Sequence, residues 1–142
     1  MTMSATHLLD TSVFSQPLKR KPVKVALDRW AALGDPRLAV SVISEAEVRY
    51  GIEWSGATTQ RHEFETSLAG RLPILIVDSA VAHAYAVIRA DLRRRGHPVG
   101  EMDILIAATA KAHNLIVATL NIRDFGKVNG LTVEDWSQPL LP

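Results

Sequence analysis

Short apolar segments, separated by longer stretches with helical periodicity, constrain the fold of this chain more than any other feature of its sequence. They cover residues 7–9, 38–43, 74–77 and 115–118, and residues 131–133 form a weaker fifth. None shows the regular alternation of polar and apolar side chains that marks a strand with one solvated face. Such segments are typical of a parallel sheet that helices cover on both faces.

The stretches between these segments carry helix signals. Helices are expected over residues 23–33, 44–54, 58–69, 79–95 and 101–113. In the second of these, Ser44 and Glu47 have the spacing of a capping box. The chain has 142 residues, the length of one domain. We expect a single domain, residues 1–142, built as a three-layer α/β/α sandwich around a central, mostly parallel sheet of four to five strands.

The composition excludes several classes of protein. The chain has no cysteine, which rules out a disulfide scaffold, a thiolate zinc site and cysteine catalysis. No stretch approaches the roughly 18 apolar residues of a membrane-spanning helix, and residues 1–10 lack the pattern of a signal peptide. None of the five histidines pairs at a metal-ligand spacing. We therefore expect a cytoplasmic protein with no membrane association and no catalytic histidine.

Acidic side chains follow three of the expected strands. Asp10 ends the first strand, Glu45 lies two residues past the second, and Asp124 comes a few residues after the fourth. The carboxyl ends of parallel strands meet at one edge of the sheet, where α/β proteins bind ligands. Asp103 reaches the same edge from the first turn of the helix that precedes the fourth strand. We expect these four carboxylates to converge there.

Four converging carboxylates predict a metal site. Asp103 opens a helix whose next five residues are apolar, and an unpaired buried carboxylate is costly. Mutual repulsion also raises the pKa values of clustered acids until some are protonated. A divalent cation removes both problems, and a ligand set of oxygens alone suits Mg²⁺ or Mn²⁺ better than Zn²⁺. Such a site supports phosphodiester hydrolysis.

Each acid also has a purely structural interpretation. These are a helix cap for Asp10, an i,i+4 pair with Arg49 for Glu45, a helix-dipole position for Asp103 and a loop position for Asp124. Asp78 also ends an expected strand, and we interpret it only as the cap of the next helix. Three acids at the same predicted edge nevertheless favour one site.

The order and spacing of four motifs resemble those of PIN-domain ribonucleases, specifically VapC-type toxins of toxin–antitoxin pairs. The motifs are residues 8–12 (LLDTS), 44–48 (SEAEV), 96–103 with 106–108 (GHPVGEMD and IAA) and 118–125 (ATLNIRDF). Each motif is weak alone, but their combination is specific and spans nearly the whole chain. No position expected to be catalytic is missing.

The resemblance implies a site and a set of partners. It implies an acidic quartet that binds Mg²⁺ or Mn²⁺, with Asp10 and Asp103 as the more direct ligands beside Glu45 and Asp124, and with Ser12, Thr119 and Asn121 as residues that orient them. It implies an endoribonuclease in which water, activated at the metal site, attacks RNA in line. It also implies a homodimer that a small DNA-binding antitoxin silences.

The charge balance fits an RNA substrate. The chain carries 16 lysines and arginines against 15 acids, a net charge of +1. Without the four proposed ligands, 11 acids face 16 bases, a balance of +5. Residues 19–24, residues 93–95 and Arg123 are candidates for contact with RNA phosphates, although each also suits a solvated surface.

Other readings of the sequence stay open at this stage. Strand-end acids also occur in haloacid-dehalogenase-like phosphatases and in receiver domains. The phosphatases need a second aspartate where this chain has Ser12. Receiver domains need paired acids near the end of the first strand, which this chain does not have there. A non-catalytic RNA-binding PIN module is a third possibility, against which the intact acids argue. The aromatic residues Trp30, Tyr50 and Trp54 are expected in the core, with a partner surface as the alternative for the last two.

Overall fold

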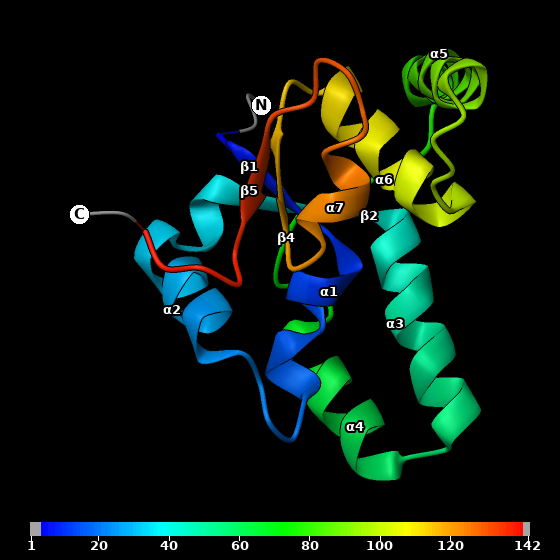
Figure 1. Ribbon diagram of the computed structural model, residues 1–142. Helices are drawn as coiled ribbons and strands as arrows, with labels where there is room; N and C mark the ends of the chain where they lie inside the picture. Colours follow the sequence, from blue (N-terminus) through cyan, green and yellow to red (C-terminus); the bar gives the residue numbers. More distant parts are fainter. Residues whose placement is uncertain (1–3, 141–142) are drawn as a thin grey trace.

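A computed structural model describes residues 4–140, which fold around a five-stranded sheet (Figure 1). The strand order is β3-β2-β1-β4-β5, and every neighbouring pair is parallel. The strands are β1 (His7–Leu9), β2 (Leu38–Ser41), β3 (Ile74–Leu75), β4 (Ile116–Thr119) and β5 (Val133–Asp135). The predicted α/β/α sandwich with a parallel sheet is therefore confirmed.

Helices fill the connections between the strands (Figure 1). They are α1 (Thr11–Phe14), η1 (Gln16–Leu18), α2 (Lys24–Leu33), η2 (Asp35–Arg37), α3 (Val42–Ser55), α4 (Thr58–Glu63), η3 (Phe64–Leu68), α5 (Ser79–Arg95), α6 (Glu101–Ala112) and α7 (Ile122–Phe125). The segment predicted as one helix over 58–69 is α4 followed by the π-helical turn η3. The other helices of two or more turns lie within a few residues of their expected positions.

Two hydrophobic clusters, one on each face of the sheet, explain why the strands are apolar without alternation. Leu9 and Val40 pack with residues of α1, α2 and η3. Leu8 and Ala39 pack with residues of α5, α6 and α7. Successive side chains of a strand point to opposite faces, and all four of these are fully buried. Burial of both faces therefore favours apolar residues at successive positions of these central strands.

The second strand ends earlier than the sequence indicates. Ser41 is its last residue and also caps α3, because its Oγ accepts a 3.0 Å hydrogen bond from the Ile43 backbone nitrogen. The predicted capping box does not form. Ser44 is instead fully buried and its Oγ accepts a 3.0 Å bond from the Thr11 hydroxyl. The start of α3 therefore packs against the start of α1.

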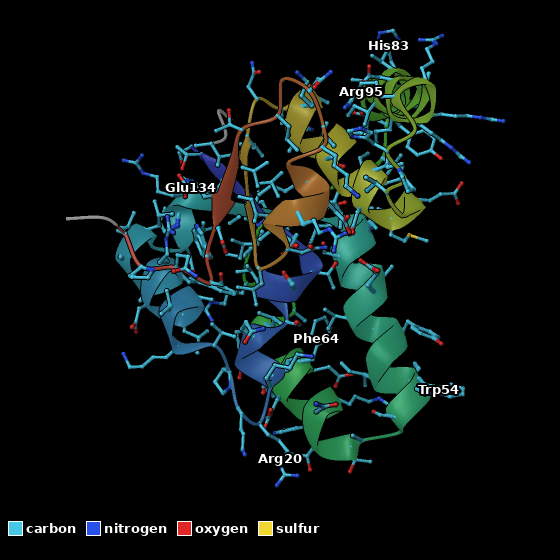
Figure 2. All side chains as sticks on the ribbon, viewed as in Figure 1. Arg20, Trp54, Phe64, His83, Arg95 and Glu134 are labelled. Carbon is cyan, nitrogen blue, oxygen red and sulfur yellow. The ribbon has the colours of Figure 1, made fainter. Side chains whose placement is uncertain are left out.

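The expectation that all three aromatic residues lie in the core is wrong for two of them. Trp30 is buried and its indole nitrogen donates to Asp35. Tyr50 and Trp54 on α3 are 68% and 81% exposed, and Figure 2 shows Trp54 projecting outward from α3. The fully buried tryptophan is Trp136, just after β5. Within residues 4–140, no helix has the length and apolar character needed to cross a membrane.

Candidate active site

The carboxyl ends of β1 and β4 meet at the candidate site. The Asp10 backbone nitrogen donates a 3.0 Å hydrogen bond to the Ala118 carbonyl, which aligns the two strand ends. Thr119, the last residue of β4, therefore stands beside Asp10. The start of α3 reaches the same edge through the contact between Thr11 and Ser44.

Asp10 is a buried carboxylate held by hydrogen bonds from three residues around it. Its Oδ1 accepts bonds of 2.6 Å from the Ser12 hydroxyl and 3.0 Å from the Val13 backbone nitrogen. Its Oδ2 accepts a 2.5 Å bond from the Thr119 hydroxyl. Burial raises the pKa of Asp10 above its ordinary value, although these hydrogen bonds oppose the rise. Asp10 also caps α1. Its role as a helix cap is therefore compatible with a role in the candidate site.

Asp103 is the acid whose charge the protein offsets least. It lies half-buried in the first turn of α6, and no residue of the described part of the chain donates it a side-chain hydrogen bond. Burial, together with the negative charges of Asp10, Glu47 and Asp124, raises the pKa of Asp103 to about 6. These four carboxylates therefore share one electrostatic environment.

The prediction for Glu45 needs correction, because Glu47 takes the position expected of it. Glu45 points along α3 to Arg49, whose guanidinium lies 3.1 Å from its Oε2, the local ion pair that was the structural alternative. Glu47 accepts a 2.5 Å hydrogen bond from Thr11 and acts electrostatically on Asp103. Two positions along a helix are about 200° around its axis, so the two side chains leave on nearly opposite sides.

A signal for Glu47 was present in the sequence. Ser44 lies three residues before it and Gly51 four residues after it, so small side chains flank Glu47 on its own face of the helix. Of these two, Ser44 contacts Thr11 at the start of α1, whereas Gly51 is exposed and faces open space. Glu45 in contrast has Arg49 four residues later as a ready partner.

Asp124 acts electrostatically on Asp103 but is itself neutralised locally. Its Oδ2 accepts a 3.0 Å bond from the Asn121 amide, and its Oδ1 lies 3.2 Å from the Lys127 ammonium. The hydrogen bond from Asn121, with the bond and charge of Lys127, holds the pKa of Asp124 below its ordinary value. The Asn121 backbone nitrogen donates to the Thr119 hydroxyl at 2.8 Å, which links this acid to Asp10. Lys127 was not among the site residues predicted from the sequence.

The oxygens present fit a divalent cation, although the predicted quartet does not close around one point. Within residues 4–140, no three acidic or histidine side chains are placed to surround a single ion. Mg²⁺ needs only one or two carboxylates in a protein, because it keeps several of its waters and takes phosphate oxygens from a substrate. Asp10 and Asp103 provide such a pair. Among the described residues, no side chain donates a hydrogen bond to Asp103, so a cation would not have to displace a donor there.

Basic residues surround this edge unevenly. Arg93 and Arg94 are exposed at the end of α5. Arg95, labelled in Figure 2, is tied to Asp91 at 2.6 Å and to the Lys127 carbonyl at 2.7 Å. Arg123 is exposed beside Asp124. Of these exposed cations, Arg123 is the one that acts electrostatically on an acid of the cluster, Asp124.

Comparison with known proteins identifies the family. The family model described as PIN domain matches residues 7–131 of the chain. The chain belongs to the PIN-domain family. The PIN-domain protein is 35% identical over 130 residues to the tRNA(fMet)-specific endonuclease VapC of Shigella flexneri, a match that covers 92% of this chain and 97% of the relative. It is 33% identical to Ribonuclease VapC2 of Haemophilus influenzae, with 92% and 97% covered.

Solved structures agree with this assignment. The PIN-domain protein matches a chain of FitAcB from Neisseria gonorrhoeae with a TM-score of 0.83 and 31% identity, covering 92% of this chain and 99% of that one. It matches a chain of DNA-bound VapBC from Salmonella typhimurium with a TM-score of 0.81 and 35% identity, covering 93% and 98%. Its resemblance to VapC-type PIN-domain ribonucleases is therefore confirmed, and the phosphatase and receiver alternatives are set aside.

Proposed function

We propose that this protein is a divalent-metal-dependent endoribonuclease that acts as the toxin of a toxin–antitoxin pair. The observation that carries the proposal is the pairing of buried Asp10 with Asp103, a carboxylate without a donor whose pKa lies near 6. Acids with pKa values shifted by burial and mutual repulsion cluster at functional sites, and a bound cation would relieve the repulsion here. The names of the relatives supply the substrate class, which is RNA.

Asp10 and Asp103 would hold the cation directly. A bound Mg²⁺ or Mn²⁺ stabilises negative charge on the phosphate and activates a water nucleophile. Ser12 and Thr119 fix both oxygens of Asp10, so that this acid presents one orientation to its ligand. Glu47, held by Thr11, lies on the α3 side of the site, where it can orient an attacking water.

The choice of Mg²⁺ or Mn²⁺ rests on the donor set. The four acids supply oxygens only, and the chain has no cysteine. His7 is engaged with Glu134 at 3.0 Å, so it is not a donor at this site. Hard cations prefer such oxygen ligands.

The proposed partners follow from the relatives. One of the solved structures named above is VapBC bound to DNA, and VapBC-5 from Mycobacterium tuberculosis, 32% identical to this chain, is described as a member of the VapBC family of toxin–antitoxin systems. We propose a small DNA-binding antitoxin as the partner of this chain, and a homodimer in which exposed Tyr50 and Trp54 take part. An enzyme that acts on cellular RNA works in the cytoplasm, where we place it.

Metal dependence is tested with purified protein and end-labelled total RNA. We expect cleavage in Mg²⁺ or Mn²⁺, none in excess EDTA, and recovery when Mn²⁺ is added beyond the chelator. Cleavage that persists in EDTA would contradict the proposal. Expression in bacteria gives the matching biological readout, because the wild type should slow growth whereas Asp103→Asn should not.

A further inference from the structure

Lys127 connects three parts of the chain at the edge of the acidic site. Its ammonium lies 3.2 Å from Asp124 Oδ1 and donates a 3.2 Å bond to the Pro98 carbonyl, in the loop before α6. Its own carbonyl accepts a 2.7 Å bond from Arg95 at the end of α5. The side chain is only 26% exposed. Lys127 is therefore fixed at both ends.

Asp124 has a donor at each carboxylate oxygen, unlike Asp103. Asn121 serves Oδ2 and Lys127 serves Oδ1. A cation that approached Asp124 would have to displace an ammonium that is already paired. At Asp103 no such competitor is present among the described residues, and repulsion from Asp10 is the largest of the charge effects on it. The acidic cluster is thus divided into an unneutralised pair and a neutralised member.

We propose that Lys127 is a positioning residue that holds Asp124 at the outer edge of the site and occupies the place of a second cation, so that the site binds one divalent ion, at Asp10 and Asp103. The inference rests on the proposed function and extends it to the number of ions. Two ions about 4 Å apart are the alternative arrangement in phosphodiester hydrolysis. Here the charge of Lys127 neutralises Asp124, as a second ion would do in that arrangement.

The inference predicts an effect that loss of structure would not produce. Replacing Lys127 by methionine keeps an unbranched side chain of nearly the same length and removes its charge. Asp124 then becomes available, and the net negative charge of the cluster increases. We expect Lys127→Met to bind two Mn²⁺ ions per chain where the wild type binds one. A variant that was merely disrupted would bind fewer ions.

The experiment is a Mn²⁺ titration followed by calorimetry and by the electron paramagnetic resonance signal of free Mn²⁺. Lys127→Arg restores the charge and should bind one ion. Lys111→Met is the matched control, since the Lys111 ammonium donates to the Gly130 carbonyl and not to an acid; it should also bind one ion. A single ion bound to Lys127→Met, or two bound to the wild type, overturns the inference.

A second variant keeps the test decisive if Lys127→Met does not fold. Asp124→Asn removes the neutralised acid itself, and it should still bind one Mn²⁺ with an affinity within roughly threefold of the wild type, the effect of a partly exposed charge. Loss of the ion in this variant overturns the inference. Failure of the wild type to bind any Mn²⁺ would instead overturn the proposed function, so the two failures are distinguishable.

Discussion

The hydroxyl of Thr119 donates a 2.5 Å hydrogen bond to Oδ2 of Asp10, across 109 positions of the chain. Both side chains are buried, at 0% and 3% exposure. The bond joins the ends of β4 and β1, so it exists only because these parallel strands are neighbours in the sheet. A buried carboxylate is thereby held in one orientation at the centre of the acidic cluster.

Thr119→Val should lower both stability and activity. The change leaves one oxygen of buried Asp10 without its donor, which costs about 1–3 kcal/mol. Because residues that orient metal ligands contribute about 10–100-fold to metal affinity, we expect a loss of Mn²⁺ affinity in that range. Denaturant unfolding and Mn²⁺ titration measure the two effects.

Thr109→Val is the matched control for this substitution. Thr109 is equally buried, but its hydroxyl donates only to the Leu105 carbonyl one helical turn earlier. That carbonyl keeps its helical partner, so the cost should be below about 1 kcal/mol. Equal Mn²⁺ affinities in the two variants would show that the bond to Asp10 does not orient a ligand.

Glu47→Gln and Glu45→Gln form a second matched pair. Glu47 faces α1 and acts on Asp103, whereas Glu45 pairs with Arg49 at the surface. We expect Glu47→Gln to reduce RNA cleavage at least about tenfold, since a charged group is removed beside the reacting phosphate. Glu45→Gln should stay within about twofold of the wild type. A larger loss of cleavage in Glu45→Gln than in Glu47→Gln would show that Glu45, and not Glu47, acts in the site.

Asp103→Asn should stabilise the metal-free protein at neutral pH. The folded-state pKa of Asp103 is raised to about 6 from 3.8, so between these values the folded state holds the proton more tightly than the unfolded state. Its ionisation therefore costs stability as pH rises through that window. In EDTA at pH 7.5, we expect Asp103→Asn to raise the free energy of unfolding by on the order of 1–2 kcal/mol.

The same substitution should have a smaller effect at pH 5, inside this window, and little effect below pH 3.8, where Asp103 is mostly protonated in the folded and the unfolded states. Asp28→Asn, at an exposed position paired with Lys24, controls for the loss of one acid. A stabilisation by Asp103→Asn that is independent of pH between 5 and 7.5 would contradict the raised pKa.

Glu134 should stabilise the far edge of the sheet. Its Oε1 accepts bonds from His7 at 3.0 Å, Trp136 at 3.1 Å and Arg29 at 3.2 Å, and Figure 2 shows Glu134 on β5. Burial opposes its ionisation, but the bonds and charges of these neighbours hold the pKa of Glu134 below its ordinary value. Stability from a lowered pKa is present at neutral pH and is lost as pH falls through that pKa.

Glu134→Gln should therefore lower the free energy of unfolding at pH 7 by on the order of 1–3 kcal/mol. The difference from the wild type should shrink as the pH falls below 4.5 and through the lowered pKa of Glu134 in the folded state. Thermal unfolding followed from pH 7 downward measures this. RNA cleavage should be retained, which separates this network from the active site.

The sequence was sufficient to predict the fold and the proximity of three of the acids. Full burial of both sheet faces forces apolar residues such as Leu8 and Leu9 into adjacent positions, and that pattern is visible without coordinates. Asp10, Asp103 and Asp124 follow from the rule that strand ends meet at one edge. Their predicted proximity agrees with the charge effects on Asp103.

Other parts required the three-dimensional structure. The choice between Glu45 and Glu47 depends on the rotation of α3, which the contact of Ser44 with Thr11 fixes. The role of Lys127 depends on a loop far along the chain, at Pro98. Contacts of this kind between distant segments leave no periodic pattern in a sequence.

The decisive measurement is the single-turnover rate of RNA cleavage in Mg²⁺ by the wild type, Asp103→Asn and Asp78→Asn. Asp78 also follows a strand, but its carboxylate only caps α5 through a 3.0 Å bond from the Val81 backbone nitrogen. We expect Asp103→Asn to lose at least about 100-fold in rate, because a metal-ion site supplies several kcal/mol of transition-state stabilisation, and Asp78→Asn to stay within about threefold. Equal rates for the wild type and Asp103→Asn would contradict an active site built on Asp10 and Asp103.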